Sequence, residues 1–151
     1  MARERDIRIA IKDALLQTGA FSHVRLTGLP EDYGEGASDL TAAAIQPGST
    51  RMLTGWDAAP EGGRTFMCQL LVTVLARHVD AELCDELAEQ LVEFVRNAVD
   101  GRPLVPGFNE PDRTMVTGWQ WLPRTAPERR IAATVTYDYI QDVWNDADTS
   151  Q

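Results

Sequence analysis

Residues 65–99 read TFMCQLLVTVLARHVDAELCDELAEQLVEFVRNAV, and this stretch decides the fold. Residues 65–76 are apolar on both of the faces that alternate along a strand, which predicts a central strand covered on both sides. The spacing then changes to that of an amphipathic helix, in which every third or fourth residue faces the core. Asp80 is well placed to cap the start of this helix, and Asp100-Gly101 to end it. The predicted apolar stripe of the helix is Leu83, Leu87, Leu91 and Val95, widened by Ala88, Val92, Ala98 and Val99.

The flanking segments complete one α+β domain that spans residues 1–151. Helical spacing predicts a short N-terminal helix over residues 6–18, which ends at Gly19. We expect a mixed or antiparallel sheet of about four strands, with the long helix packed on one of its faces. The other expected segments are an extended segment or short strand at 21–29, loops at 31–41 and 101–113, a strand at 41–46 stopped by Pro47-Gly48, a flap or hairpin arm at 49–65, strands at 114–122 and 129–140, and a frayed tail at 141–151.

Composition excludes several classes of protein. The chain has 151 residues with 14 basic and 23 acidic side chains, a net charge of −9, so tight binding to nucleic acid is not expected. The N-terminus lacks the apolar region of a signal peptide, and the longest apolar stretch, residues 70–76, is far too short to span a bilayer. Cys68 and Cys84 form no CxxC pair, so we expect both to be small buried apolar residues in a soluble protein from a reducing compartment.

Motifs for catalysis, metal binding or phosphate binding are not recognisable. None of the four serines lies in a GxSxG motif, and nothing marks a triad with His23 or His78. Gly34-Glu35-Gly36 lacks the third glycine of a dinucleotide loop. The alternating residues His78, Asp80, Glu82 and Cys84 are better explained as a strand end, a helix cap and an acidic helix face. We therefore expect no catalytic residue, no metal site and no cofactor.

Aromatic residues are concentrated in the closing hairpin, where TGWQWLPRTAPERRIAATVTYDYI covers residues 117–140. They could form a stacking platform for a ligand or the inner face of an ordinary hairpin. Period-two alternation favours the inner face, because the opposite face is small and polar. The predicted inner face contains Met115, Thr117, Trp119 and Trp121 from the first strand, and Ile131, Ala133, Val135, Tyr137 and Tyr139 from the second.

The small polar face of this hairpin predicts contact with another subunit. Its row of Gln120, Thr134, Thr136 and Asp138 is β-prone and nearly uncharged, and Asp138 is expected outside, where it would face a partner. The long loops at 31–41, 47–65 and 101–113 are the other expected contact regions. Exposed arginine and aromatic residues often anchor interfaces, and these loops carry Arg51, Trp56, Arg64, Arg102 and Phe108.

Element order and texture across nearly the whole chain resemble the tail terminator (tail completion) proteins of long-tailed bacteriophages and prophages. The resemblance rests on the segment AFSHV at 20–24, the strand AAAIQP at 42–47, the stretch quoted at the outset, and the hairpin with WQWLP and ERRIAATVTYDYI. It implies a non-enzymatic virion protein, assembled in the host cytoplasm, that forms a homo-oligomeric ring, commonly a hexamer. Such a ring caps the tail tube, stops its polymerisation and joins head-completion proteins, while DNA passes through without tight binding.

Two other classes remain open. Another head–tail connector or head-completion protein would share the ring and the small α+β subunit. A small monomeric binding module or enzyme would instead use an exposed face with Trp119 and Trp121.

Overall fold

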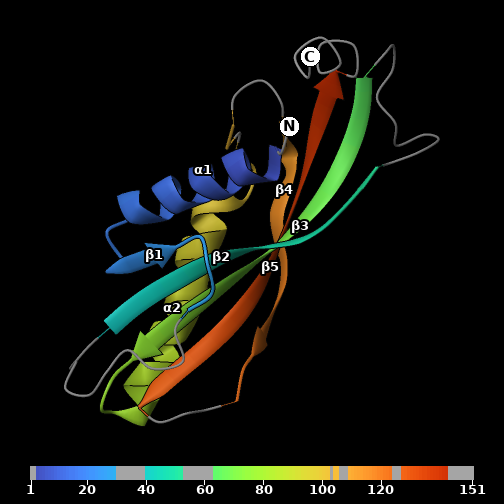
Figure 1. The fold of residues 1–151 in the computed structure, drawn as a ribbon. Helices are drawn as coiled ribbons and strands as arrows, with labels where there is room; N and C mark the ends of the chain where they lie inside the picture. The colour runs from blue at the N-terminus through green and yellow to red at the C-terminus, as the bar shows by residue number, and fades with distance from the viewer. Residues whose placement is uncertain are drawn as a thin grey trace.

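The computed structural model describes residues 3–29, 40–52, 63–102, 104–105, 109–123 and 127–142. Two helices and five strands follow one another along the chain (Figure 1). They are α1 (Arg3–Gln17), β1 (His23–Arg25), β2 (Leu40–Met52), β3 (Gly63–Arg77), α2 (Ala81–Val99), β4 (Asn109–Trp121) and β5 (Glu128–Asp142). The loop predicted at 31–41 and the phosphate-loop candidate within it lie outside the described residues, apart from the start of β2.

The five strands form one mixed sheet in the order β1-β2-β3-β5-β4. β1 runs parallel to β2, and every other neighbouring pair is antiparallel. The α+β prediction is confirmed, with β3 at the centre of the sheet as expected. The fifth strand is β1, which occupies three residues of the segment predicted to be extended or a short strand.

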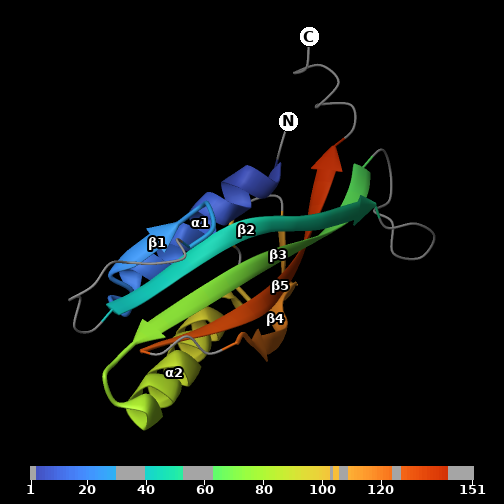
Figure 2. The same ribbon diagram turned by 60° about the horizontal axis from the view of Figure 1, so that its bottom comes forward.

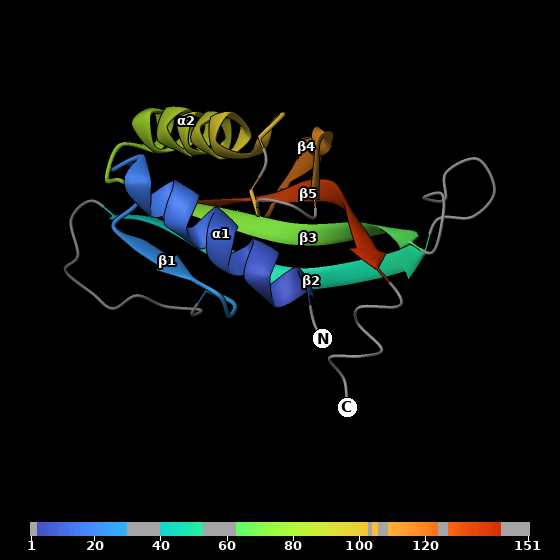
Figure 3. The same cartoon turned by 90° about the horizontal axis from the view of Figure 1, so that it is seen from above.

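Both helices pack on the same face of the sheet (Figure 3), and the hydrophobic core lies between the helices and the sheet. Burial of these aliphatic side chains removes apolar surface from water, which is the main favourable contribution to folding. Gly19 has φ +72° just past the end of α1, as its predicted role at a helix end requires. The largest fully buried residues of this core include Ile7, Ile11 and Leu15 from α1, Leu91 and Val95 from α2, Val72 and Val74 from β3, and Ile131 and Tyr137 from β5.

The long helix α2 starts and ends where predicted, but its buried face is rotated. Cys84 and Ala88 are fully buried, whereas Leu83 is exposed and Leu87 only half-buried. Because Cys84 and Ala88 are small, the helix backbone can approach β3. The Cys84 thiol donates a hydrogen bond to the carbonyl oxygen of Ala76 at 3.3 Å. The stripe predicted from leucine spacing was therefore displaced by one residue at the start of the helix.

Removal of the α2 cap is expected to destabilise the domain. The Asp80 carboxylate accepts the backbone N–H groups of Glu82 and Leu83 at 2.9 and 3.1 Å. Asp80→Ala should therefore lower the free energy of unfolding by about 1 kcal/mol, measured by urea denaturation. Asp13→Ala, at an exposed position of α1, is the control and should change it by less than about 0.5 kcal/mol.

Strand β2 continues through Pro47-Gly48, where the sequence predicted a stop. Its pairing with β3 shifts by one residue between Pro47 and Thr50, so the extra residue is absorbed as a β-bulge. Proline is tolerated there because β1 pairs only with residues 42–44 of β2, which leaves the later part of β2 at the sheet edge. A hairpin arm is therefore present, as predicted for 49–65, and residues 53–62 lie outside the description.

Strand β4 begins at Asn109, within the predicted loop 101–113, and it too is bulged. Its register with β5 shifts between Val116 and Gly118, so Val116 pairs with Val135 of the core face. Met115 and Thr117 therefore lie on the opposite face from the one predicted, because one extra residue reverses the alternation. Trp119 and Trp121 pair with Ala133 and Ile131 and are on the predicted side.

The sheet face that lies away from the helices, here named the outer face, is only partly covered. Leu29 packs on a small cluster of Leu40, Ala42 and Leu75 at one end of it. Farther along β3, Gln69 and Leu71 are exposed. The prediction of a central strand covered on both sides is thus correct only for the end of β3 next to α2 (Figure 2).

Both cysteines are free and buried, as predicted. Burial raises the pKa of the Cys68 thiol above its ordinary value of 9.0. Thr50 Oγ1 lies 2.9 Å from the sulfur of Cys68 and favours the thiolate, but desolvation is the larger effect. The folded state therefore favours the neutral thiol.

This raised pKa gives a pH-dependent contribution to stability. The contribution is fully present below pH 9.0 and is lost as the pH rises from there through the pKa of the folded state, because only the unfolded chain then ionises freely. We expect the free energy of unfolding to fall more steeply above pH 9 in the parent than in Cys68→Ala. Urea denaturation across the alkaline range measures this, and equal slopes would contradict it.

Neither described helix is long and apolar enough to cross a membrane.

Candidate subunit interface

The open part of the outer face is a continuous surface built by three neighbouring strands. Thr134 of β5 lies at its centre, with Leu71 of β3 on one side and Gly118 of β4 on the other. Directly opposed residues share a face, so these three strands contribute side chains to one surface. A shallow hollow of about 330 Å³ lies here, lined by Leu71, Thr117, Gly118, Trp119, Gln120, Ala132 and Thr134.

The hollow has no charged side chain among its lining residues. Leu71 is 37% exposed, which is unusual for a leucine on a central strand. The hydroxyl of Thr117 lies 3.4 Å from both the Thr134 carbonyl oxygen and the Thr136 hydroxyl, so the threonines also contact one another. The result is a neutral, partly apolar surface on a chain of net charge −9.

Three of the four predicted interface residues of the hairpin are brought together on this surface. Gln120 is exposed, and Thr134 and Thr136 are half-buried. Asp138 was predicted to be solvated, and this was wrong, because it is 1% exposed. Asp138 lies on the interior strand β5, where it pairs with Met67 of β3 and Glu110 of β4.

The two predicted loop anchors whose side chains the structure describes, Arg51 and Arg102, do not line the outer-face hollow. Arg51 is exposed near the end of β2, and Arg102 is exposed beside the end of α2. Arg64 lies in β3, but its side chain is outside the description, as are Trp56 and Phe108 altogether. Their assignment to an interface stays a prediction.

The two tryptophans have different surroundings on the helix side of the sheet. Trp121 is half-buried against the core, and the guanidinium of Arg129 lies 4.5 Å from its ring centroid. Arg129 also approaches Asp85 of α2 at 3.5 Å, so this stacked pair connects the sheet to the helix. Trp119 remains 50% exposed on β4, which is an edge strand of the sheet.

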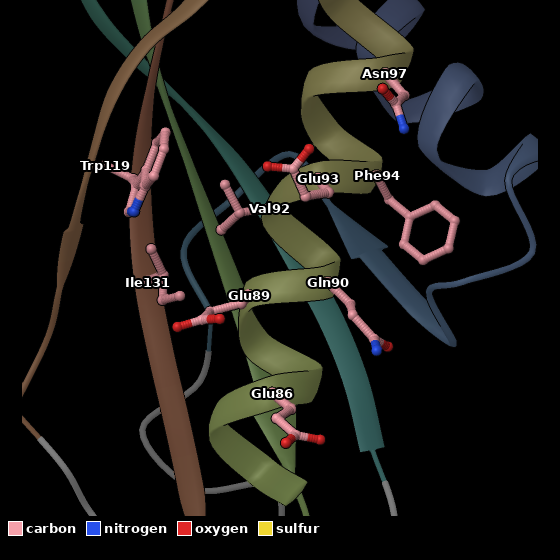
Figure 4. A pocket seen from close by; sticks show the side chains of 9 residues that line it. All are labelled: Glu86, Glu89, Gln90, Val92, Glu93, Phe94, Asn97, Trp119 and Ile131. Carbon is pink, nitrogen blue, oxygen red and sulfur yellow. The ribbon is translucent and has the colours of Figure 1, made fainter. Parts of the chain in front are cut away.

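Trp119 forms one side of a second depression, the α2–β4 groove, with a volume of about 680 Å³ (Figure 4). Buried Val92 and Ile131 contribute apolar surface beneath it. Its acidic side chains, Glu86, Glu89 and Glu93, all come from α2.

The residues tested for chemistry have structural roles. His78 Nδ1 accepts the backbone N–H of Asp80, and Asp80 caps α2, as predicted from their spacing. The Ser22 hydroxyl donates to the Thr41 carbonyl at 2.6 Å and ties β1 to β2. Within the part of the chain that the structure describes, no three His, Cys, Asp or Glu residues come together as metal ligands.

Sequence reasoning missed Leu71 and the α2–β4 groove. Leu71 belongs to an apolar run that predicts burial on both faces, so its exposure had no signal in the sequence. The glutamates of the groove show only as an acidic helix face, and their proximity to Trp119 depends on the tertiary packing of α2 beside β4.

The architecture thus defines a small α+β domain with an uncharged hollow on the open face of its sheet. No family model and no curated protein matches the chain. Among solved structures, a chain of one described as "Virion of native gene transfer agent (GTA) particle" is similar at a TM-score of 0.49 and 16% identity, over 89% of this chain and 94% of that chain.

Proposed function

We propose that this chain is a structural virion protein that forms a ring at the end of a phage tail tube, ending tube polymerisation and providing the surface for head joining. The observation that supports assembly is the open outer face around Thr134. The tail-terminator role and a ring of six copies come from the resemblance in element order and texture described above.

Charge is the first reason to expect self-contact at the outer face. Two copies of a chain with net charge −9 repel each other, so they should meet where neither copy presents charge. The hollow around Thr134 satisfies this condition, exposed Leu71 gives it apolar area, and Met115 is exposed on the same face. Cores of protein interfaces are likewise depleted of charged residues.

Geometry is the second reason. If the outer face of one copy meets a different surface of the next, the contact is heterologous, and repetition closes into a ring when the rotation permits. The helix-covered side of the sheet is the other extended surface of this subunit (Figure 3). Tail tube protein and a head-completion protein would then contact the two rims of the ring.

The acidic composition suits a channel for DNA. Phosphates are repelled by an acidic wall at short range, so the duplex would pass through without tight binding. We infer a structural and non-enzymatic role, with no cofactor.

Electron microscopy of particles that lack this protein tests the role. Overlong tails without attached heads would support termination of the tube. Tails of normal length without heads would instead assign the chain to another head–tail connector.

The exposed Trp119 side chain favours one competing function, a small monomeric binding module. That alternative predicts a strict monomer whose tryptophan fluorescence is quenched by an oligosaccharide. Such a result would rule out the ring.

A further inference from the structure

The α2–β4 groove has two chemically different walls. Trp119 from β4 supplies an exposed aromatic surface on one side (Figure 4). Glu86, Glu89 and Glu93 from α2 supply negative charge on the other. A segment that fits this groove needs an apolar side chain toward the tryptophan and a cation toward the glutamates.

The glutamates of the acidic wall differ in whether a described residue forms an ion pair with them. Glu93 is paired with Arg96 at 2.9 Å. Neither Glu86 nor Glu89 forms an ion pair with any residue that the structure describes. Two carboxylates beside an apolar floor therefore remain available for a cation from outside.

The arm of the same chain, here defined as residues 48–52, presents matching chemistry. All five residues are exposed, and the ends of β2 and β3 extend past the helices (Figures 2 and 3). Arg51 forms no ion pair within the described residues, and Met52 is 43% exposed. A guanidinium that has no ion-pair partner among the described residues thus lies next to an exposed, adaptable apolar side chain.

Strand geometry matches the arm to the groove. Arg51 pairs with Met67, and Met52 pairs with Phe66, so the two side chains point to opposite faces of the arm. When an edge strand enters a groove, two consecutive side chains of that strand face opposite walls of the groove. Arg51 would then meet the α2 glutamates while Met52 packs on Trp119.

We propose that the α2–β4 groove of one copy binds the arm of the next copy. This proposal rests on the proposed ring, because it requires a second copy of the chain. In one subunit the arm extends away from α2, so the contact is between copies (Figure 3). Arm and groove are different surfaces, so the contact is heterologous and suits a ring rather than a two-fold dimer.

Charge reversal tests the contact in the intact protein. Arg51→Glu and Glu89→Arg should each raise the concentration for half-maximal assembly about tenfold, as like charges then face each other. The double variant should return to within about twofold of the parent, because the pair is restored with its sign reversed. Glu82→Arg makes the same charge change on α2 outside the groove and should assemble like the parent.

Light scattering over a concentration series measures all four variants, and circular dichroism confirms their folding. Rescue in the double variant supports the arm-in-groove contact. If the parent assembles and the single reversals assemble equally well, the contact is refuted while the ring stands. If the parent stays monomeric up to its solubility limit, the ring and this contact both fail.

Discussion

Leu71→Glu is expected to abolish assembly while leaving the subunit folded. Leu71 is exposed beside Thr134 in the neutral hollow of the outer face, so a glutamate there would become a desolvated charge in the contact between copies. An unpaired charge in an interface costs several kcal/mol, which corresponds to at least about a hundredfold weaker association. Sedimentation velocity of the variant should show only the subunit mass.

A matched control separates this effect from the added charge. Val79→Glu introduces the same side chain at a residue that is 85% exposed and lies just before α2. It should assemble as the parent does, and both variants should unfold within about 1 kcal/mol of the parent. If Leu71→Glu assembles normally, the outer face is not part of the contact between copies.

Gly48→Ala should produce the largest loss of stability of any single methyl addition among the described glycines. A Cβ at residue 48 would clash with the carbonyl oxygen of Gln69, and backbone atoms cannot move aside as a flexible side chain can. The bulge of β2 must therefore distort or separate from β3. We expect a loss of about 3 kcal/mol in the free energy of unfolding, measured by urea denaturation.

Gly118→Ala is the control for this change. An added Cβ at residue 118 meets no atom within 4 Å, although Gly118 also lies in a bulged strand. Its stability should stay within about 0.5 kcal/mol of the parent or rise slightly, because alanine restricts the unfolded chain. Equal losses in the two variants would show that the close approach at Gly48 is not what requires glycine.

The elements with strong local signals were predictable from the sequence. The apolar run of β3 and the helical spacing of α2 gave the correct element types, and Asp80 and Gly101 marked the correct ends of α2. These features depend on interactions between residues close in sequence and on the periodic spacing of apolar residues along each element. One strand and one helix of this kind were enough to predict an α+β domain.

The length of β2 and the face of the first half of β4 could not be predicted, because each depends on a bulge. One extra residue after Val116 placed Met115 and Thr117 on the outer face, although strict alternation assigned them to the core. Another at Gly48 let β2 continue where Pro47 predicted a stop. A bulge is set by pairing with a distant strand, so the local sequence carries little sign of it.

The grouping of residues on the outer face was predicted in part. Gln120, Thr134 and Thr136 were grouped correctly, because period-two alternation holds along β5 and after the bulge of β4. Asp138 belongs to the same alternation, yet it is buried. An acidic side chain is ordinarily expected in solvent, so the sequence did not predict the burial of Asp138.

The mass of the assembled parent protein tests the central claim most directly. Native mass spectrometry or sedimentation velocity should find one closed species at an integral multiple of the 16.7 kDa subunit, with six copies expected from the resemblance. A protein that remains a monomer, or stops at a two-fold dimer, at every concentration tested would contradict the ring.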